Sequence, residues 1–485
     1  MAIKKLLSPI LLLLGCAYAQ LQSQNNTFNS TFRLTSQQIK AANLSETTAH
    51  NVEVALNFER SNNAGSLTQD DPFYVLPKDY DYANPPPPGT VLKVEEHTNI
   101  SLYTLPMGLS MSRILYSSEA LNGSSVPASA YVLWPYLPRT FSKLTPYSDT
   151  NSSGQALFPV VALAHGTSGQ TTACAPSNLR GLWDDFHEPF AIALAGYAVV
   201  APDYVGLGVA EISTYFILPA HANDVFHGVA AAQKAWPDQL SQEFVVAGQS
   251  QGGAVAWASA QRQAKRPVKG YLGTMAASPF TNVLADISAD AMAENNARVV
   301  GIAQGLNSVL PTFSLSDWLT DAGIARWKLL HEIQGCGATG GQLFNTGART
   351  VPILRDGWNT SEAAMWFSNV TTNGGRPFAG PMLVLQGTDD PNANEPVTTL
   401  SVNKTCAMYP DNQLEYIRWE NITHVPVLYA GQHLWLDWIR DRFAGVEAPK
   451  GCSTQTMKPP SRINGAGFKG WASQTWFLEY DVYGI

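Results

Sequence analysis

The amino-acid sequence predicts an α/β fold with a mostly parallel central sheet, N-terminal antiparallel strands and an inserted helical cap. Three observations support this prediction. Apolar strands and helices alternate between residues 158 and 276, which is typical of a parallel sheet. One of these strands ends in a Gly-Gln-Ser-Gln-Gly turn at residues 248–252, which leads directly into a helix. About a hundred residues, 281–380, then lack a convincing sheet strand before strands resume.

The chain begins with the features of an exported protein. A basic pair at residues 4–5 precedes a short apolar run at residues 6–14, and Ala17-Tyr18-Ala19 forms a small-residue cleavage site. This arrangement predicts a secretory signal peptide over residues 1–19, with an apolar run too short to span a bilayer. No later stretch is long enough for a membrane span. We therefore expect a soluble, secreted protein.

Composition and cysteine usage narrow the function classes. Only 14% of the 485 residues are charged, the formal net charge is −8, and no basic cluster follows the N-terminus. Nucleic acid is therefore not an expected partner. Once the signal peptide with Cys16 is removed, an even number of cysteines predicts two disulfides in an oxidising compartment, and three pairings remain open. These cysteines are Cys174, Cys336, Cys406 and Cys452.

Sequons of the N-x-S/T type predict a glycosylated surface. They begin at Asn25, Asn29, Asn43, Asn99, Asn122, Asn151, Asn359, Asn369, Asn403 and Asn421.

The segment before the core differs from it in composition. Residues 20–88 form a polar N-terminal extension with no regular pattern, in which Asp71–Pro77 favours an extended segment over a helix. The proline run at residues 85–88 predicts a rigid polyproline II break. We place the start of the core at Gly89, and the core itself at residues 89–280 and 381–447.

The core elements follow from apolar runs, turn residues and helical stretches. Antiparallel strands are expected at 91–94, 111–116 and 130–134, with a turn at Asn122-Gly123. Parallel strands are expected at 159–164, 196–202, 244–247, 270–276, 382–386 and 414–419, and helices at 222–236, 253–266 and 425–443.

Two further segments complete the domain organisation. Residues 281–380 contain helical pieces such as Asp286–Gln304 and Leu315–Gln334, which favour a cap inserted into the core, with a separate helical domain as the alternative. Residues 448–485 form a C-terminal tail that we expect to run as a surface loop. No internal repeat is present.

Ser250 is the candidate nucleophile. It is the central residue of a G-x-S-x-G pentapeptide placed between an apolar strand and a helix, which is the setting of a nucleophile elbow. Glycines on either side are required because the turn brings the strand and the helix too close for side chains. A serine hydroxyl needs a base, and the base needs an orienting carboxylate.

The acid and the base are expected in that order after the serine, on loops that follow late strands. Asp389 and Asp390 follow strand 382–386 directly; we favour Asp390 as the acid and keep Asp389 as the alternative. His424 lies just past strand 414–419 and is the candidate base. His433 is expected to pack against the sheet instead, and His221 to make structural hydrogen bonds.

Two loops supply the candidate oxyanion hole. One donor is the backbone N–H of Gln251, the residue after the nucleophile. The second is the N–H of Thr167 in the loop after strand 159–164, with Gly166 as the alternative. His165 is expected to hold that loop in shape, and Asp203, which precedes the serine, to be structural. No H-E-x-x-H motif or clustered ligand set is present, so we expect no metal or cofactor.

Taken together, these motifs resemble the fungal secretory lipases of the yeast lipase A type, within the α/β-hydrolase superfamily. The resemblance covers most of residues 89–445. It implies an α/β-hydrolase fold, hydrolysis of carboxylic esters, a Ser250–Asp390–His424 triad, and disulfides Cys174–Cys336 and Cys406–Cys452. The matching segments are Ala164–Thr167, Cys174–Ser177, Ala201–Tyr204, Gly206–Gly208, His221–Asp224, Gly248–Gly253, Gly387–Asp390 and Trp438–Phe443.

The sequence thus predicts a secreted serine hydrolase that cleaves carboxylic esters, as a lipase or carboxylesterase, through an acyl-enzyme. An alternative keeps the same triad in a tailoring hydrolase, lactonase or acyltransferase acting on a fungal secondary metabolite. A non-catalytic binding protein on the same scaffold is the third hypothesis. The expected partner is a small-molecule or lipid ester, with interfacial lipid contact through the cap and a monomeric chain.

Overall fold

The computed structural model of the protein describes residues 31–141, 150–289, 295–346 and 350–458. The expected signal peptide, residues 1–19, lies outside the described residues, as do Asn25 and Asn29 and the last part of the expected tail, residues 459–485.

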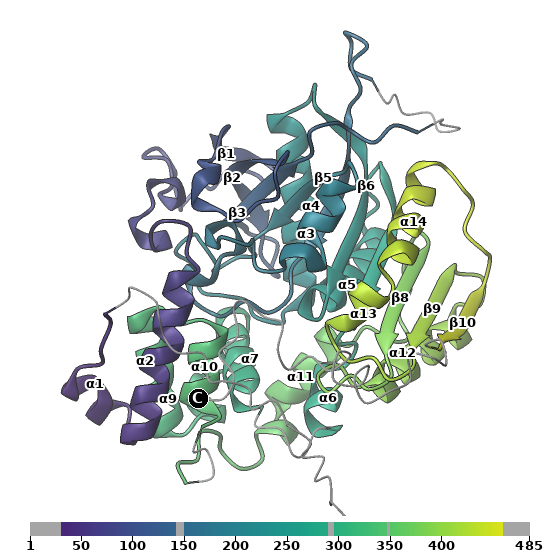
Figure 1. The fold of residues 1–485 in the computed structure, drawn as a ribbon. Helices are drawn as coiled ribbons and strands as arrows, with labels where there is room; N and C mark the ends of the chain where they lie inside the picture. Colours follow the sequence, from purple (N-terminus) through teal and green to yellow (C-terminus); the bar gives the residue numbers. More distant parts are fainter. Residues whose placement is uncertain (1–30, 142–149, 290–294, 347–349, 459–485) are drawn as a thin grey trace, which may run out of the picture.

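A ten-stranded sheet forms the centre of the molecule (Figure 1), in the order β1-β2-β3-β5-β4-β6-β7-β8-β9-β10. The pairs β1–β2, β2–β3 and β3–β5 are antiparallel, and every other neighbouring pair is parallel. This confirms the predicted mostly parallel sheet with N-terminal antiparallel strands. The strands are β1 Val91–Glu95, β2 Ser110–Glu119, β3 Ser125–Trp134, β4 Phe158–Ala164, β5 Ala198–Pro202, β6 Leu240–Gln249, β7 Tyr271–Ala277, β8 Met382–Gly387, β9 Leu414–Trp419 and β10 Cys452–Met457.

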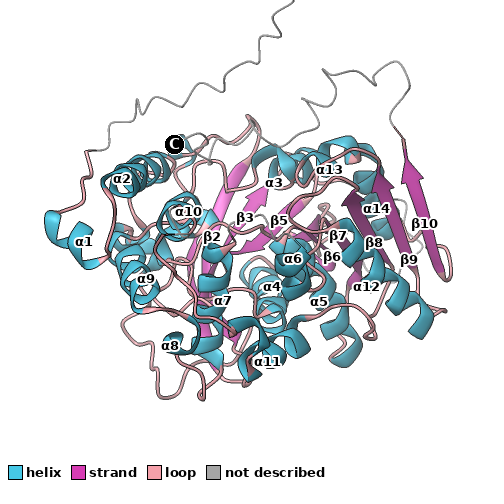
Figure 2. Cartoon of the chain, turned by 90° about the horizontal axis from the view of Figure 1, so that it is seen from below, coloured by secondary structure: helices cyan, strands magenta, loops and turns pink. Residues whose placement is uncertain are grey.

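Alternating side chains of the buried strands pack against helices on the two faces of the sheet. In β6, Phe244 and Val246 join one apolar cluster, whereas Val245 and Ala247 join the other. Helices α4 and α5 cover the first face, and α3, α13 and α14 cover the second (Figure 2). These five helices are α3 Pro189–Leu194, α4 Leu218–Ala235, α5 Gln251–Lys265, α13 Pro426–Ala430 and α14 Gln432–Phe443. A further core helix, α12 Glu395–Met408, lies between β8 and β9 in the chain.

The helix expected at 425–443 is in fact two helices. Gly431 ends α13 and begins α14, with φ −101° and ψ 7°, outside the helical pattern of either. Pro426 occupies the first turn of α13, where a backbone N–H would have no acceptor within the helix, so proline costs no hydrogen bond there.

Between β7 and β8 the described residues form helices and contribute no strand to the sheet. The expected helix 286–304 corresponds to the end of α6 and the first part of α7, and residues 290–294 between these two lie outside the description. The helices are α6 Val283–Ala289, α7 Asn296–Val309, α8 Leu315–Trp318, α9 Asp321–Ile333, α10 Gly337–Phe344 and α11 Glu362–Thr371.

The prediction of an irregular N-terminal extension is wrong for residues 36–61. This segment forms α1, Ser36–Ala41, and α2, Glu46–Ser61, and α2 packs against α10 (Figures 1 and 2). Ser45 caps α2 by accepting a hydrogen bond from the N–H of Thr48 at 3.1 Å. The buried face mixes apolar Val52 and Leu56 with polar Asn51 and Asn57, which hides the helical period in the sequence.

The prediction that the tail begins as a surface loop is also wrong. Residues Cys452–Met457 form β10, which pairs in parallel with β9 and completes the edge of the sheet. Its side chains are mostly exposed, and several of them are Ser, Thr or Gln, so no apolar alternation marks it as a strand. The backbone N–H and C=O groups of β9 supply the pairing instead.

The structure contains two disulfides, Cys174–Cys336 and Cys406–Cys452. The first joins the loop after β4 to the residue before α10, so it connects the core to the helices inserted between β7 and β8. The second joins α12 to the start of β10 and holds the edge strand in place.

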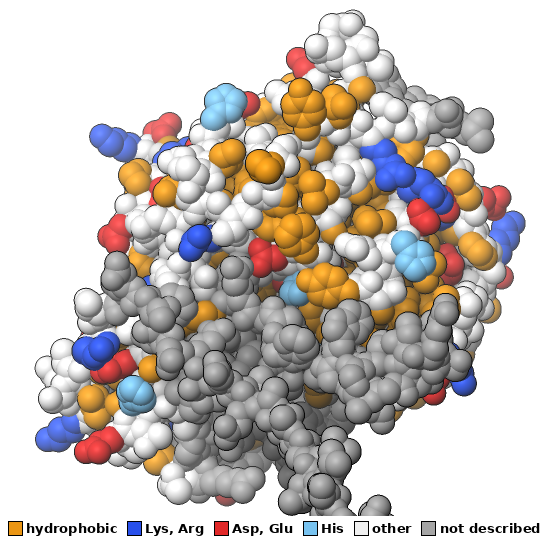
Figure 3. All heavy atoms as spheres, in the orientation of Figure 1, with side chains coloured by type: hydrophobic (Ala, Val, Ile, Leu, Met, Phe, Trp, Pro, Cys, Tyr) orange, Lys and Arg blue, Asp and Glu red, His pale blue; other side chains and the backbone are white. Residues whose placement is uncertain are grey.

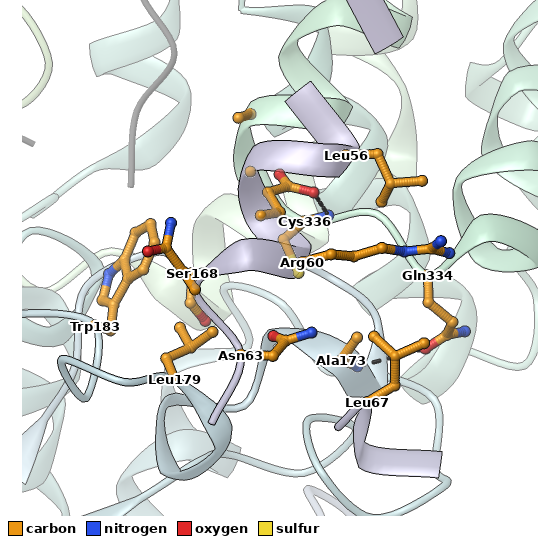
Figure 4. A pocket seen from close by; sticks show the side chains of 14 residues that line it. Leu56, Arg60, Asn63, Leu67, Ser168, Ala173, Leu179, Trp183, Gln334 and Cys336 are labelled. Carbon is orange, nitrogen blue, oxygen red and sulfur yellow. Dashed lines mark hydrogen bonds between the residues drawn. The ribbon is translucent and has the colours of Figure 1, made fainter. Parts of the chain in front are cut away.

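Half-buried Glu59 connects α2 to the beginning of α10. Its carboxylate accepts hydrogen bonds from the N–H groups of Cys336 and Thr339, both at 2.8 Å, and from the Thr339 hydroxyl at 2.6 Å. A small cavity of about 20 Å³ lies beside this contact (Figure 4), with Leu56 and Arg60 on one side and Ala173 on the other. It has room for about one water molecule, so it is a packing gap rather than a ligand site.

We expect Glu59→Ala to lower the free energy of unfolding by about 2 kcal/mol, because two partly buried N–H groups and the Thr339 hydroxyl lose their charged acceptor. Denaturant titration measures this change. Glu46→Ala is the matched control, since Glu46 is exposed on the same helix, and it should have a much smaller effect. An equal loss in both variants would contradict this role of Glu59.

Candidate active site

Ser250 stands at a strained turn between β6 and α5. Its φ is 62° and its ψ is −122°, a conformation that residues other than glycine rarely adopt. Its backbone N–H donates to the carbonyl of Ala277 in the neighbouring strand at 2.9 Å. An added Cβ at Gly248 or Gly252 would overlap the carbonyl oxygen of Ala164. The two glycines therefore allow the close packing that lifts the serine above the sheet edge.

The structure brings Ser250, His424 and Asp390 together. His424 Nε2 lies 2.8 Å from Ser250 Oγ, and His424 Nδ1 lies 2.8 Å from Asp390 Oδ2. The side chain of Asp390 is fully buried and that of His424 is 6% exposed, so water is largely excluded from the pair. This geometry allows His424 to take the serine proton while Asp390 orients the imidazole.

Asp390 and Asp389 have different environments. The Oδ1 atom of Asp390 accepts from the N–H groups of Asn392 and Ala393 at 2.9 and 3.0 Å, and Oδ2 accepts from Gln386 Nε2 at 3.1 Å. Asp389 is exposed, and its carboxylate accepts from the Thr388 hydroxyl at 3.1 Å. Of the two aspartates, only Asp390 contacts His424.

The loop that carries His424 is held from two sides. The carbonyl of His424 accepts from Gln249 Nε2 at 3.3 Å and from the Ser278 hydroxyl at 3.1 Å. Gln249 is the last residue of β6 and Ser278 follows β7, so these two donors fix His424, the candidate base, relative to the turn that carries Ser250. The expectation that His433 packs against the sheet is wrong, because it is exposed on α14.

The backbone N–H groups of Thr167 and Gln251, the two candidate oxyanion donors, have no acceptor among the described residues. The side chains of these residues bond to each other, since the Thr167 hydroxyl donates to Gln251 Oε1 at 2.9 Å. Gln251 Nε2 in turn lies 3.4 Å from His221 Nδ1. The N–H of Gly166, the alternative donor, points to Asp184 Oδ2 at 3.4 Å.

Asp203, His165 and His221 also lie near these loops, and each of them contacts other side chains of the core. Asp203 is buried and accepts from the Ser129 and Ser177 hydroxyls, each at 2.6 Å. His165 stacks on Tyr204, which stacks on His221, with ring centroids 4.2 and 4.3 Å apart. Burial lowers the pKa of His165 to about 4 and that of His221 to about 3, so both rings are neutral at pH 7.

A cavity of about 290 Å³ opens over Ser250 and His424. Residues from the insertion line it together with the core, including Arg298 of α7. Trp183, Asp184 and His187 form one wall of this cavity. They could not be predicted as cavity residues from the sequence, because no motif marks them. Leu182, Trp183 and Asp185 have φ of 56°, 71° and 42°, so the wall is a strained segment.

Exposed apolar side chains lie next to the active-site wall. Figure 3 shows such side chains gathered on one face, over the region where Figure 1 draws α3. In and beside α3, Phe186 is 49% and Leu194 is 52% exposed.

Among the residues that the structure describes, no group of three or more His, Cys, Asp or Glu side chains is arranged to hold a metal ion. The same described part contains no helix of the length and apolar character needed to cross a bilayer.

The fold and the strained serine turn are those of the alpha/beta hydrolases. A model of the Alpha/beta hydrolase family matches residues 161–437, more than half of the chain, and the chain belongs to this family. No curated protein matches the sequence.

Solved structures show the same fold at low sequence identity. Lipase A from Candida antarctica is 15% identical, with a TM-score of 0.62, and the match covers 82% of this chain and 91% of that one. The rice cell wall degrading esterase LipA from Xanthomonas oryzae is 17% identical, with a TM-score of 0.56 and coverage of 73% and 98%.

We expect Gly252→Ala to prevent folding or to cost more than about 3 kcal/mol, because the new methyl group would overlap the backbone of Ala164 and His165. Gly341→Ala in α10 is the control, since an added Cβ there meets nothing within 4 Å. Thermal melts of the two purified variants provide the comparison. Similar melting temperatures would refute the close-packing argument.

Proposed function

We propose that the protein is a secreted serine hydrolase that cleaves carboxylic esters through a Ser250–His424–Asp390 triad. The single observation that carries the proposal is the continuous hydrogen-bonded chain from Ser250 Oγ through His424 to buried Asp390. The serine also occupies a strained turn at the start of a helix, and the chain belongs to the alpha/beta hydrolase family. Two structural relatives are named as a lipase and an esterase.

In the proposed reaction, His424 Nε2 removes the proton from Ser250 Oγ as the oxygen attacks the ester carbonyl. A C–O bond forms, and the negative charge on the carbonyl oxygen is stabilised by the N–H groups of Thr167 and Gln251. His424 then donates its proton to the leaving alcohol as the ester bond breaks. Water, deprotonated by His424, then attacks the acyl carbon. The bond to Ser250 Oγ breaks, the carboxylic acid leaves, and His424 returns the proton to Oγ while Asp390 keeps the imidazole oriented.

The remaining expectations belong to the same proposal. Export through residues 1–19 is supported by the two disulfides, which form and persist in oxidising compartments. We propose that residues 281–380 form the cap, that the chain acts as a monomer, and that its specific relatives are the fungal secretory lipases. We also propose lipid contact through the cap, together with Phe186 and Leu194, which are exposed side chains of the α/β core.

The proposal is tested with p-nitrophenyl esters from acetate to palmitate, together with a fluorophosphonate probe. We expect Ser250→Ala to abolish both ester turnover and labelling. Turnover of long-chain esters would indicate a lipase, and turnover of short-chain esters alone would indicate an esterase. If the wild-type protein neither turns over any ester nor reacts with the probe, the proposal fails.

The acid is tested by a matched pair of neighbouring residues. We expect Asp390→Asn to lower kcat by about 10³-fold or more, because the amide no longer fixes the His424 tautomer. Asp389→Asn should remain near the wild-type rate, since its side chain is exposed. Steady-state kinetics on one p-nitrophenyl ester compares them; the reverse result would reassign the acid to Asp389.

The link between the two oxyanion donors provides another test. We expect Thr167→Val, which removes the hydroxyl that bonds Gln251 but keeps the shape, to lower kcat by about tenfold. Thr167→Ser retains the hydroxyl and should recover most of the rate. An unchanged kcat in Thr167→Val would show that the side-chain link does not position the donors.

A further inference from the structure

The cavity over Ser250 has a polar lining for a pocket that accepts esters. Sites for apolar ligands are lined mainly by hydrophobic and aromatic side chains, with few polar groups. Here Trp183, Tyr215 and Phe280 supply the large apolar surfaces. The polar side chains outside the proposed triad include those of Gln170, Asp184, His187, Asn295, Arg298, Asn345 and Asn392.

Arg298 is the only lysine or arginine among the described residues that line this cavity. It belongs to the first turn of α7 and is half-buried. Within the described part of the chain, its guanidinium makes no hydrogen bond to another residue and no ion pair. Its N–H donors are therefore available to an anion that enters the cavity, and hydrogen bonds between a guanidinium and an anion are charge-assisted.

Phe280 connects Arg298 to the proposed catalytic base. The guanidinium carbon of Arg298 lies 4.6 Å from the centroid of the Phe280 ring, within the range of a cation–π interaction. Phe280 is 2% exposed, and its centroid lies 6.0 Å from that of the His424 ring. The aromatic ring thus holds the positive charge at the same end of the cavity as the catalytic histidine.

No carboxylate of the described residues lies within ion-pair distance of the Arg298 guanidinium. Burial raises the pKa of Asp286 well above its usual value, against the opposing effect of Arg298, and its Oδ1 accepts from the N–H of Asn394 at 2.9 Å. Asp184 also lines the cavity, but it is directed to the N–H of Gly166. Burial likewise raises the pKa of Tyr215, so its phenol is neutral.

We infer that Arg298 is a substrate-recognition residue that binds a carboxylate on the ester substrate while the scissile carbonyl sits at Ser250. The preferred substrate is then an ester that carries a free carboxylate elsewhere in the molecule, rather than a wholly neutral ester. This inference rests on the proposed function, because it assigns a substrate class to the same site. A planar guanidinium presents parallel pairs of N–H donors, and such a pair can bind both oxygens of one carboxylate.

The test compares monoethyl with diethyl esters of succinate, glutarate, adipate and suberate, in which one free carboxylate replaces one of the two ethyl ester groups. Ethanol release gives kcat and KM for each ester. For at least one chain length we expect wild-type kcat/KM to be about tenfold or more higher for the monoester. In Arg298→Gln this ratio should fall to about one or below, mainly through a higher KM, and Arg298→Lys should keep part of it.

Lys328→Gln is the matched control. It removes the same charge from an exposed position on α9 that does not line the cavity, so the monoester-to-diester ratio should stay at the wild-type value. Circular dichroism melts verify that the variants are folded. If Arg298→Gln does not fold, the ratio measured with folded Arg298→Lys decides. The lysine ammonium is a point charge that cannot make the bidentate contact of a guanidinium, so the monoester-to-diester ratio should still fall below the wild-type value.

A second readout does not depend on turnover. Hexanoate should slow the labelling of Ser250 by a fluorophosphonate probe in the wild type, and this protection should weaken in Arg298→Gln. Equal turnover of both ester types, or an Arg298→Gln ratio unchanged from wild type, would overturn the carboxylate subsite and leave the proposed esterase intact. Absence of both turnover and labelling would overturn both.

Discussion

The close approach of β4 to the beginning of α5 is the constraint on which the site depends. At Gly252 the helix lies so near the carbonyl of Ala164 that no side chain fits. Ser250 must then adopt a positive φ, which costs of order 1–3 kcal/mol and must be offset by the surrounding sheet. The same approach brings the loop with Thr167 opposite the first N–H of the helix. One packing contact thereby sets both the nucleophile and the candidate oxyanion donors.

The parallel arrangement of the sheet explains why distant parts of the chain meet at this point. Strands β4, β6, β7, β8 and β9 run in the same direction, so the loops that follow them leave from one edge. Asp390 and His424 follow β8 and β9, while Gln249 and Ser278 hold the His424 loop from β6 and β7. Moving any of these strands by one residue would break several contacts together.

Sequence reasoning predicted the strands and the candidate triad because local patterns encode them. Apolar runs mark the buried strands, and the glycines around Ser250 mark the turn. It failed where tertiary contacts decide the structure. Buried Asn51 and Asn57 hide the period of α2, and polar β10 forms only because β9 offers an unpaired edge. Arg298 and Phe280 carry no local signal at all, since they meet only when α7 packs over the sheet.

The order of the four cysteines along the chain has a consequence for biosynthesis. The pairs are consecutive: Cys174 with Cys336, then Cys406 with Cys452. A chain that enters an oxidising compartment from its N-terminus presents Cys336 before either later thiol, although it lies 162 residues after its partner. The first pair can therefore close without a competing cysteine, and the last two then have only each other. Entry from the N-terminus therefore favours the native pairing over the two others that are possible.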